Sequence, residues 1–518
     1  MRIGGLATGM DIDALVEKLM SAERIPLDKM SQDKTTLEWK RDGFRDINLK
    51  LSELDKMMLD MKLSKTYNSK TVSSSQEGAV TATGSSSASN GTYDIKVTQL
   101  ASAAINVSQN SIGEAIDPNE TLGSQEDKFT NGVDYGEFEF FTFDENGKKI
   151  PHKFNVNKED TLNDVLKRIS KDDNNVRAFF DEQSQKVIME TTRTGKYNQS
   201  DEFLGAEIGF DGQTNSSFFT NTLQIKNGKK DENDIWQKAE NGGINAEFEY
   251  NNSGLIMESK TNSYKLNDIT FQFKNTTNGT NAKLTVTNDV ESSFESIMKF
   301  IDKYNEVVET LNESQREEKY RDYKPLTEAE KKGLSDKEVE LWEERAKSGI
   351  LKSESAISEG LFSMRQSWYA QVETGGDLTS LTQIGIKTSA NYLDGGKLIV
   401  DEDKLKQALQ EDPDGVQNLF ANSEVGESRG LVNRLEDAVK GTMDKIYERA
   451  GGKSGTDTLE GYTLGKRMKD LNKRISSFED RLVQVESRYW NQFTAMEKAI
   501  SKMNQQSSQL LSQFGGGM

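Results

Sequence analysis

The sequence predicts an α+β protein of several domains, with terminal coiled-coil helices, a helical domain, and β-rich domains inserted between them. Three observations lead to this prediction. Apolar residues recur with helical spacing at both ends of the chain, they alternate with polar residues in the middle, and helical spacing returns after Asp289. The 518 residues are enough for three or four domains.

The C-terminal end carries a long coiled-coil stripe. Its apolar residues step by four and three positions, and an additional step of four, from Tyr489 to Phe493, interrupts the heptad pattern once. The stripe consists of Leu464, Met468, Leu471, Ile475, Phe478, Leu482, Val485, Tyr489, Phe493, Met496, Ile500, Met503 and Leu510. A helix of this length spans roughly 75 Å, and its narrow apolar face requires a second helix as a partner.

The N-terminal end supplies a candidate partner. Ile12, Leu15, Val16 and Leu19 predict a short amphipathic helix, and Pro26 is placed in the first turn of a second helix. The apolar stripe of the second helix consists of Leu37, Phe44, Ile47, Leu51, Leu54, Met58 and Met61. Periodicity alone leaves open whether the terminal helices assemble with other subunits or form a helical hairpin within a monomer.

The middle of the chain predicts β-structure. Alternation begins after a Ser-, Gly- and Thr-rich stretch, 73–91, and Asn146-Gly147 predicts a hairpin turn. Thr161 followed by Asp164 predicts the start of a helix through a capping box. The predicted strands are 93–97, 138–142, 149–156, 176–180, 186–190, 246–250, 255–258, 269–273 and 284–287.

After Asp289 the sequence again predicts helices. The first carries a regular stripe, and Thr327 with Glu330 and Ser335 with Glu338 form two successive capping boxes. The stripe consists of Phe294, Ile297, Ile301, Tyr304, Val308 and Leu311. Further helices are predicted at 353–371, 402–410, from Pro413, and at 430–450.

These elements predict a nested domain order, because helical segments from both ends must meet. We expect the central part, 66–454, to fold without the ends. The predicted domains are 1–40 (coiled-coil leg), 41–72 (helical domain), 73–118 (β-rich head domain), 119–210 (inserted β-α-β head domain), 211–288 (β-rich head domain, second part), 289–454 (helical domain, second part) and 455–518 (C-terminal leg).

Composition restricts the function. A net charge of −19 argues against a nucleic-acid or anionic-membrane partner, and no apolar run is long enough for insertion into a bilayer. The N-terminus lacks the pattern of a cleavable secretory signal. The chain has no Cys and one His, His152, which we interpret as a half-exposed strand residue. We therefore expect no enzyme activity, no cofactor and no metal site.

Several segments resemble the flagellar hook-associated protein 2 family, the filament cap proteins. The most specific are the two ends, 5–16 and 492–500, and weaker matches lie in the middle. The weaker matches are 286–289, 381–386, and 161–165 followed by 176–178, of which the last is similar to a small β-α-β insertion found in hook and filament proteins.

This resemblance implies a structural protein that caps the distal end of the flagellar filament, promotes flagellin folding and polymerisation, and prevents flagellin loss. It implies export through the flagellar secretion apparatus to the extracellular filament tip, which suits a chain without Cys. The implied partners are further copies in an oligomeric ring, flagellin, the hook–filament junction proteins and a flagellar export chaperone. The alternative is a surface adhesin that binds host glycans or mucus through the inserted β domains.

We expect the subunit and filament interface on the terminal helices. Trp490 and Phe493 flank the stutter, where local unwinding lets large side chains reach a neighbouring subunit. The expected interface residues are Leu15, Leu19, Leu37, Phe44, Leu471, Ile475, Leu482, Trp490, Phe493, Met496 and Ile500.

Overall fold

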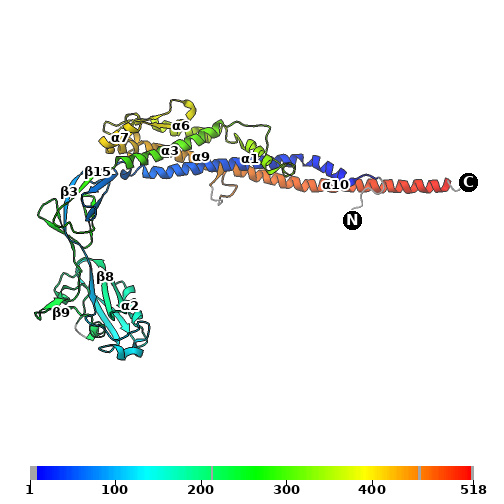
Figure 1. The fold of residues 1–518 in the computed structure, drawn as a ribbon. Helices are drawn as coiled ribbons and strands as arrows, with labels where there is room; N and C mark the ends of the chain where they lie inside the picture. The colour runs from blue at the N-terminus through cyan, green and yellow to red at the C-terminus, as the bar shows by residue number, and fades with distance from the viewer. Residues whose placement is uncertain (1–8, 212–213, 453–456, 515–518) are drawn as a thin grey trace. The chain divides into compact units, whose positions relative to one another are not determined.

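The computed structural model describes residues 9–211, 214–452 and 457–514. The chain forms two compact units, of which the first combines the segments before Asn68 and after Asp289, and the second is Asn68–Asp289. The first unit is helical and the second is rich in strands (Figure 1). The predicted α+β class is therefore confirmed. The predicted segment 5–8 lies outside the described residues.

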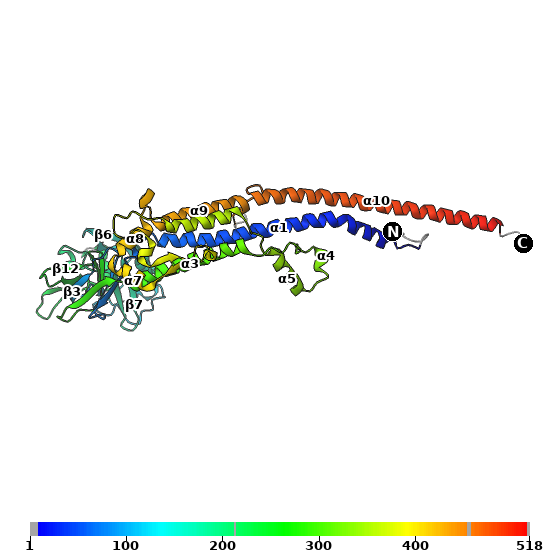
Figure 2. The ribbon, with the colours of Figure 1, turned by 90° about the horizontal axis from the view of Figure 1, so that it is seen from above.

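Long helices dominate the first unit (Figure 2). They are α1 (Ile12–Asp60), α3 (Val290–Arg316), α4 (Glu328–Lys331), α5 (Asp336–Lys347), α6 (Ser355–Tyr369), α7 (Glu402–Glu411), α8 (Pro413–Ala421), α9 (Leu431–Ala450) and α10 (Thr463–Phe514). A short antiparallel ribbon, β16 (Ile386–Thr388) with β17 (Leu398–Val400), accompanies them.

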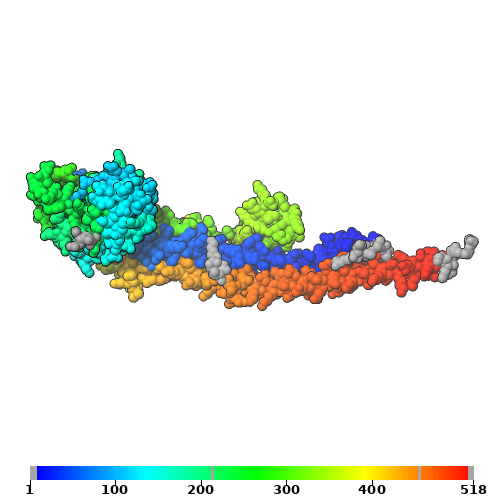
Figure 3. All heavy atoms as spheres, turned by 90° about the horizontal axis from the view of Figure 1, so that it is seen from below, coloured from blue at the N-terminus to red at the C-terminus, as the bar shows by residue number. Residues whose placement is uncertain are grey.

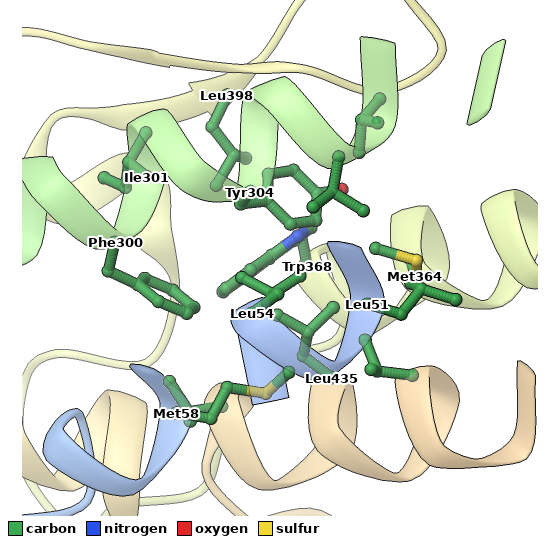
Figure 4. Close-up of a cluster of buried hydrophobic side chains, with 14 of the residues drawn as sticks. Leu51, Leu54, Met58, Phe300, Ile301, Tyr304, Met364, Trp368, Leu398 and Leu435 are labelled. Carbon is green, nitrogen blue, oxygen red and sulfur yellow. The ribbon is translucent and has the colours of Figure 1, made fainter. Parts of the chain in front are cut away.

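The core of the helical unit is built on the second half of α1. Leu51, Leu54 and Met58 are completely buried and lie among residues of α3, α6 and α9 (Figure 4). Trp368 of α6 packs edge-on against Tyr304 of α3, with ring centroids 5.3 Å apart. Replacing a buried leucine here by alanine would cost about 2–5 kcal/mol, so the unit depends on α1.

Two predictions about α1 are wrong. Pro26 lies inside one continuous helix and does not separate two helices. Proline removes one backbone hydrogen bond, to the carbonyl of residue i−4. Here that residue is Ala22, and because Ala22 and Pro26 are both exposed, water can satisfy the free carbonyl. The stripe from Phe44 to Met61 also differs from the prediction in part, because it faces the helical core, in which Leu464 and Met468 represent the C-terminal stripe.

The second unit contains two separate cores. The first lies between a five-stranded sheet, of order β1-β15-β3-β11-β12, and a three-stranded sheet, of order β13-β14-β2. Phe248 and Phe271 are fully buried in it. The strands are β1 (Lys70–Ser74), β2 (Val80–Gly84), β3 (Gly91–Gln99), β11 (Ala246–Tyr250), β12 (Ile256–Ser259), β13 (Ser263–Leu266), β14 (Ile269–Phe273) and β15 (Ala282–Asn288).

The second core belongs to the segment between β3 and β11. Helix α2 (Leu162–Lys171) begins at the predicted capping box of Thr161 and Asp164. The strands are β4 (Ala103–Val107), β5 (Gly136–Phe143), β6 (Lys149–Val156), β7 (Val176–Asp181), β8 (Lys186–Thr194), β9 (Gly228–Lys230) and β10 (Trp236–Lys238). The β5–β6 hairpin turns at Asn146-Gly147 as predicted.

The interpretation of His152 as half-exposed is wrong. The side chain is buried, its Nε2 lies 2.7 Å from the Thr142 hydroxyl, and its ring contacts Phe140. Burial lowers the pKa of His152, because the charged imidazolium loses hydration. The paired strand β5 brings the partners of His152 from ten residues away, which local sequence alternation does not indicate.

Two buried carboxylates hold a loop of the second unit in place. Glu240 accepts hydrogen bonds from the backbone N–H groups of Glu207 and Ile208, at 2.8 and 2.9 Å. Glu207 in turn accepts from the N–H groups of Tyr197 and Asn198. Lys238 is the nearest cation, 3.6 Å from Glu240. Burial raises the pKa of Glu240 to about 7, and burial also raises the pKa of Glu207.

The raised pKa of Glu240 predicts a pH-dependent stability. Between the ordinary value of 4.5 and about 7 the folded unit binds a proton that the unfolded chain does not, so the free energy of unfolding falls as pH rises through this range. We expect a loss on the order of 2 kcal/mol between pH 5 and pH 8, measured by urea unfolding of 68–289. In Glu240→Gln this loss should shrink. An unchanged pH dependence in the variant would contradict the assignment.

The structure does not support independent folding of the expected fragment 66–454. That fragment lacks α1, and without α1 the core of the helical unit is open. We predict instead that 68–289 folds alone. Its two ends leave the unit together, since Lys70 pairs with Asn288 in the β1–β15 ladder. Circular dichroism should show one or two cooperative thermal transitions for 68–289, and 66–454 should expose apolar surface that binds a hydrophobic dye. A gradual, non-cooperative melt of 68–289 would refute the boundary.

Candidate assembly interface

Helices α1 and α10 form an antiparallel pair (Figures 1 and 2). Near the start of α1, the Tyr489 hydroxyl donates to Glu23 Oε1 at 3.0 Å. Near the start of α10, the guanidinium of Arg45 lies 5.5 Å from the centre of the Tyr462 ring. Early residues of α1 thus meet late residues of α10, so the two termini of one chain provide the helical partner that each stripe requires.

The core of this pair is small. Its buried members are Ile12, Val16 and Met20 of α1 and Leu482 and Val485 of α10. Partly buried residues extend the cluster: Leu27, Phe478, Tyr489, Trp490 and Phe493. Five buried side chains provide far less apolar burial than the core of the helical unit, so we expect the pair to open more readily than that core.

The predicted interface residues separate into three groups. Phe44 is fully buried in the helical core, with Leu37 packed against it, and Leu471 and Leu482 are buried. Partly buried residues of α10 are Ile475, Trp490, Phe493, Met496 and Ile500. Leu15 and Leu19 are 39% and 37% exposed. The structure brings Leu482, Trp490 and Phe493 into one cluster and keeps Phe44 away from it.

Trp490 and Phe493 have different surroundings at the stutter. Phe493 continues the stripe that faces α1 and packs on the small core. Trp490 also contacts that core, and its Nε1 donates to Glu486 Oε1 at 3.3 Å on the same helix. Both residues thus have contacts within the chain that already explain part of their burial.

Apolar side chains remain exposed beside the pair. Leu15 and Leu19 lie one turn apart on a flank of α1, next to the buried Ile12–Val16–Met20 stripe. On α10, Met503, Leu510 and Leu511 are more than half exposed. Periodicity predicted a partner helix for Leu15, Leu19, Met503 and Leu510, and the structure leaves these residues largely uncovered. They form a surface that another helix could bury.

The face of α10 opposite α1 is polar. It carries a shallow groove of about 680 Å³ that Arg488, Asn491 and Gln492 line together with Val483. Helical spacing indicates only the apolar stripe and therefore does not predict this groove. A run of amides and an arginine on one face is its only sequence signal.

The described residues include no group of three or more His, Cys, Asp or Glu side chains that could hold a metal ion. Likewise, no helix within 9–211, 214–452 and 457–514 has the length and apolar character needed to cross a membrane. The fold thus defines an α+β protein whose two termini form one antiparallel helical pair with exposed apolar flanks.

Comparisons with known proteins identify the family. The models of the flagellar hook-associated protein 2 N-terminus and C-terminus match residues 8–104 and 243–505. Flagellar hook-associated protein 2 of Halalkalibacterium halodurans is 36% identical over 98% of this chain and 99% of its own length. An A-type protein of the same name from Pseudomonas aeruginosa is 26% identical over 98% of this chain and 96% of its own. The chain belongs to the flagellar hook-associated protein 2 family.

The fold agrees with this assignment. The crystal structure of domains D1-D2-D3 of the flagellar cap protein FliD from Escherichia coli matches with a TM-score of 0.52 at 17% identity, over 83% of this chain and 99% of that one. The resemblance inferred from the two ends of the sequence is therefore confirmed, and family membership puts the chain among flagellar proteins.

The small core between α1 and α10 predicts a local effect of mutation. In Leu482→Ala with Val485→Ala, the pair should open, because each truncation removes apolar contacts worth about 1–3 kcal/mol in this partly exposed core. Hydrogen exchange should become faster in 12–25 and 478–493 and stay unchanged in 68–289. Val483→Ala is the matched control, since Val483 is 67% exposed. Equal exchange in the double variant and the control would contradict the pairing.

Proposed function

We propose that this protein caps the distal end of the bacterial flagellar filament. In this role it forms an oligomeric ring, promotes folding and polymerisation of flagellin, and prevents flagellin loss. Family membership supports the role, and one observation carries the mechanism: the α1–α10 pair leaves apolar side chains exposed on both helices.

The terminal helices act as the leg of the cap, formed by 1–40 and 455–518. A pair with a small buried core can change partners at modest cost, because little apolar contact is lost when it opens. The exposed Leu15, Leu19 and Met503 then gain burial against helices of flagellin or of neighbouring copies. Such exchange would let the leg release one flagellin subunit and receive the next.

The remaining partners follow from the same role. Export through the flagellar secretion apparatus requires an unfolded chain, and the absence of Cys removes any need for oxidative folding at the filament tip. Exposed apolar helix surface must be covered before export, which suits a flagellar export chaperone. At the filament, the hook–filament junction proteins are further partners. For the adhesin alternative, no specific observation on the described residues favours it.

The test separates the interface from the fold. In Leu15→Ser with Leu19→Ser, the chain should fold and be exported, because both side chains are already exposed. Cells should nevertheless shed flagellin monomers and lose motility, since the leg can no longer bury this flank. Leu49→Ser is the control, at an equally exposed position of α1 within the helical unit. Normal filaments and motility in the double variant would refute the proposed role of this flank.

A second variant tests the stutter. Trp490→Ala with Phe493→Ala removes two large contacts, each worth about 3–5 kcal/mol if fully buried and less here, where both are partly exposed. We expect export with an intact second unit, but loss of flagellin retention. If motility persists while hydrogen exchange shows an opened α1–α10 pair, the two residues stabilise only that helical pair and do not contact flagellin or neighbouring copies.

A further inference from the structure

Residues 317–350 form a lobe that projects from the helical unit (Figures 2 and 3). The lobe has its own small aromatic core, in which the Tyr323 and Trp342 rings lie 4.6 Å apart. The Trp342 indole donates to the Lys324 carbonyl at 2.8 Å. Capping boxes at Thr327 and Ser335 fix the starts of α4 and α5. The lobe is therefore a defined element that presents α5 to the surroundings.

The outer surface of α5 is acidic and carries a leucine. Asp336, Glu340 and Glu344 recur every four residues, so they share one face of the helix, and all three are exposed. Among the described side chains, none of these three carboxylates has an ion-pair or hydrogen-bond partner. Leu341, 52% exposed, borders this face with the exposed Lys337 one turn before it, and Leu334 ahead of the helix is also exposed.

A surface of opposite character lies on α6 of the same unit, and we call it the aromatic patch. Phe362, Arg365 and Tyr369 recur on one helix face, and Phe362 and Tyr369 are 66% and 56% exposed. The Arg365 guanidinium donates to the Tyr369 hydroxyl at 3.2 Å and has no ion pair within the described part of the chain. Tyr392, 76% exposed, belongs to the loop that covers the stem of Arg365 at Gly396.

The aromatic patch is also cationic at its edge. Arg316, at the exposed end of α3, donates to the Leu393 carbonyl at 2.8 Å. The Asp394 carboxylate in the same loop accepts hydrogen bonds from the Ser389 hydroxyl at 2.6 Å and from the Asn391 side-chain amide. Tyrosine, phenylalanine and arginine are the side chains that concentrate binding energy at protein interfaces. This surface therefore suits a partner that offers carboxylates and aliphatic side chains.

We propose that the acidic face of α5 in one copy docks on the aromatic patch of the next copy, and this contact rests on the proposed ring. Every copy carries both surfaces, so the contact repeats head to tail, and a head-to-tail contact closes into a ring when the rotation is suitable. A chain with a net charge of −19 repels its own copies. A cationic aromatic surface facing carboxylates offsets that repulsion at the point of contact.

The size of the two surfaces predicts a weak pairwise contact. Four patch residues cover less than the roughly 800 Å² per partner of a standard stable interface. Closure of the ring compensates for the weakness of each pairwise contact. Each copy is held by two neighbours, and the last contact forms within the assembly. The contact should therefore be seen in assembled protein and be scarce in dilute monomer.

Cysteine cross-linking tests the contact cleanly, because the natural chain has no Cys. Full-length Leu341→Cys and Phe362→Cys proteins with different tags are mixed, assembled and oxidised. A disulfide between the two tags can only join two copies. We expect about tenfold more cross-linked product than from Leu341→Cys mixed with Val425→Cys, a control at an 83% exposed position.

Charge exchange supplies a second readout. Arg365→Glu should reduce the population of rings seen by electron microscopy several-fold, and combining it with Glu340→Arg and Glu344→Arg in the same chain should restore them. Rings that form without the 341–362 cross-link would overturn this contact and leave the proposed function intact. If the unmodified protein forms no ring, the proposed function fails and this contact fails with it. If rings persist in Arg365→Glu but flagellin retention is lost, the patch binds flagellin and the proposal is overturned.

Discussion

Burial of the apolar stripe along α1 is the constraint on which the helical unit depends. A single long helix in water cannot bury such a stripe, so the first half of α1 pairs with α10 in antiparallel orientation. This pairing brings the early residues of α1 beside later residues of α10, and the start of α10 lies beside Arg45, within the second half of α1.

Helix α1 serves two purposes along its length. The apolar stripe of its second half, from Phe44 to Met58, is buried in the core with α3, α6 and α9, as Figure 4 shows for Leu51, Leu54 and Met58. Its first half meets only α10 and keeps Leu15 and Leu19 exposed. One continuous helix thus joins a stable core to a marginal pair. The exposed α5 lobe and the aromatic patch of α6 are held by the stable part, which suits surfaces that must keep their shape in an assembly.

The sequence predicted much of this fold from periodicity and capping. The stripe of α10, the capping boxes at Thr161, Thr327 and Ser335, and the hairpin turn at Asn146-Gly147 are local signals, and the structure contains all of them. Pairing between distant segments was not predictable in this way. The stripe from Phe44 to Met61 has the same spacing whether its partner is α10 or α9, and only tertiary packing decides between them. Burial of His152 depends on the neighbouring strand β5, and burial of Glu240 depends on the distant loop at Glu207 and Ile208. Among the expected interface residues, periodicity could not distinguish the exposed Leu15 from the buried Phe44.

Pairing of α1 with α10 within one chain is the central claim, and a distance measurement tests it most directly. Spin labels on Arg24→Cys and Arg488→Cys would flank the Glu23–Tyr489 hydrogen bond, and no natural Cys interferes. The labelled protein is diluted with unlabelled protein and examined by pulsed electron spin resonance. Helices packed about 10 Å apart predict one short distance that persists on dilution. Loss of that distance on dilution would show that the helices pair between copies, and it would contradict this account.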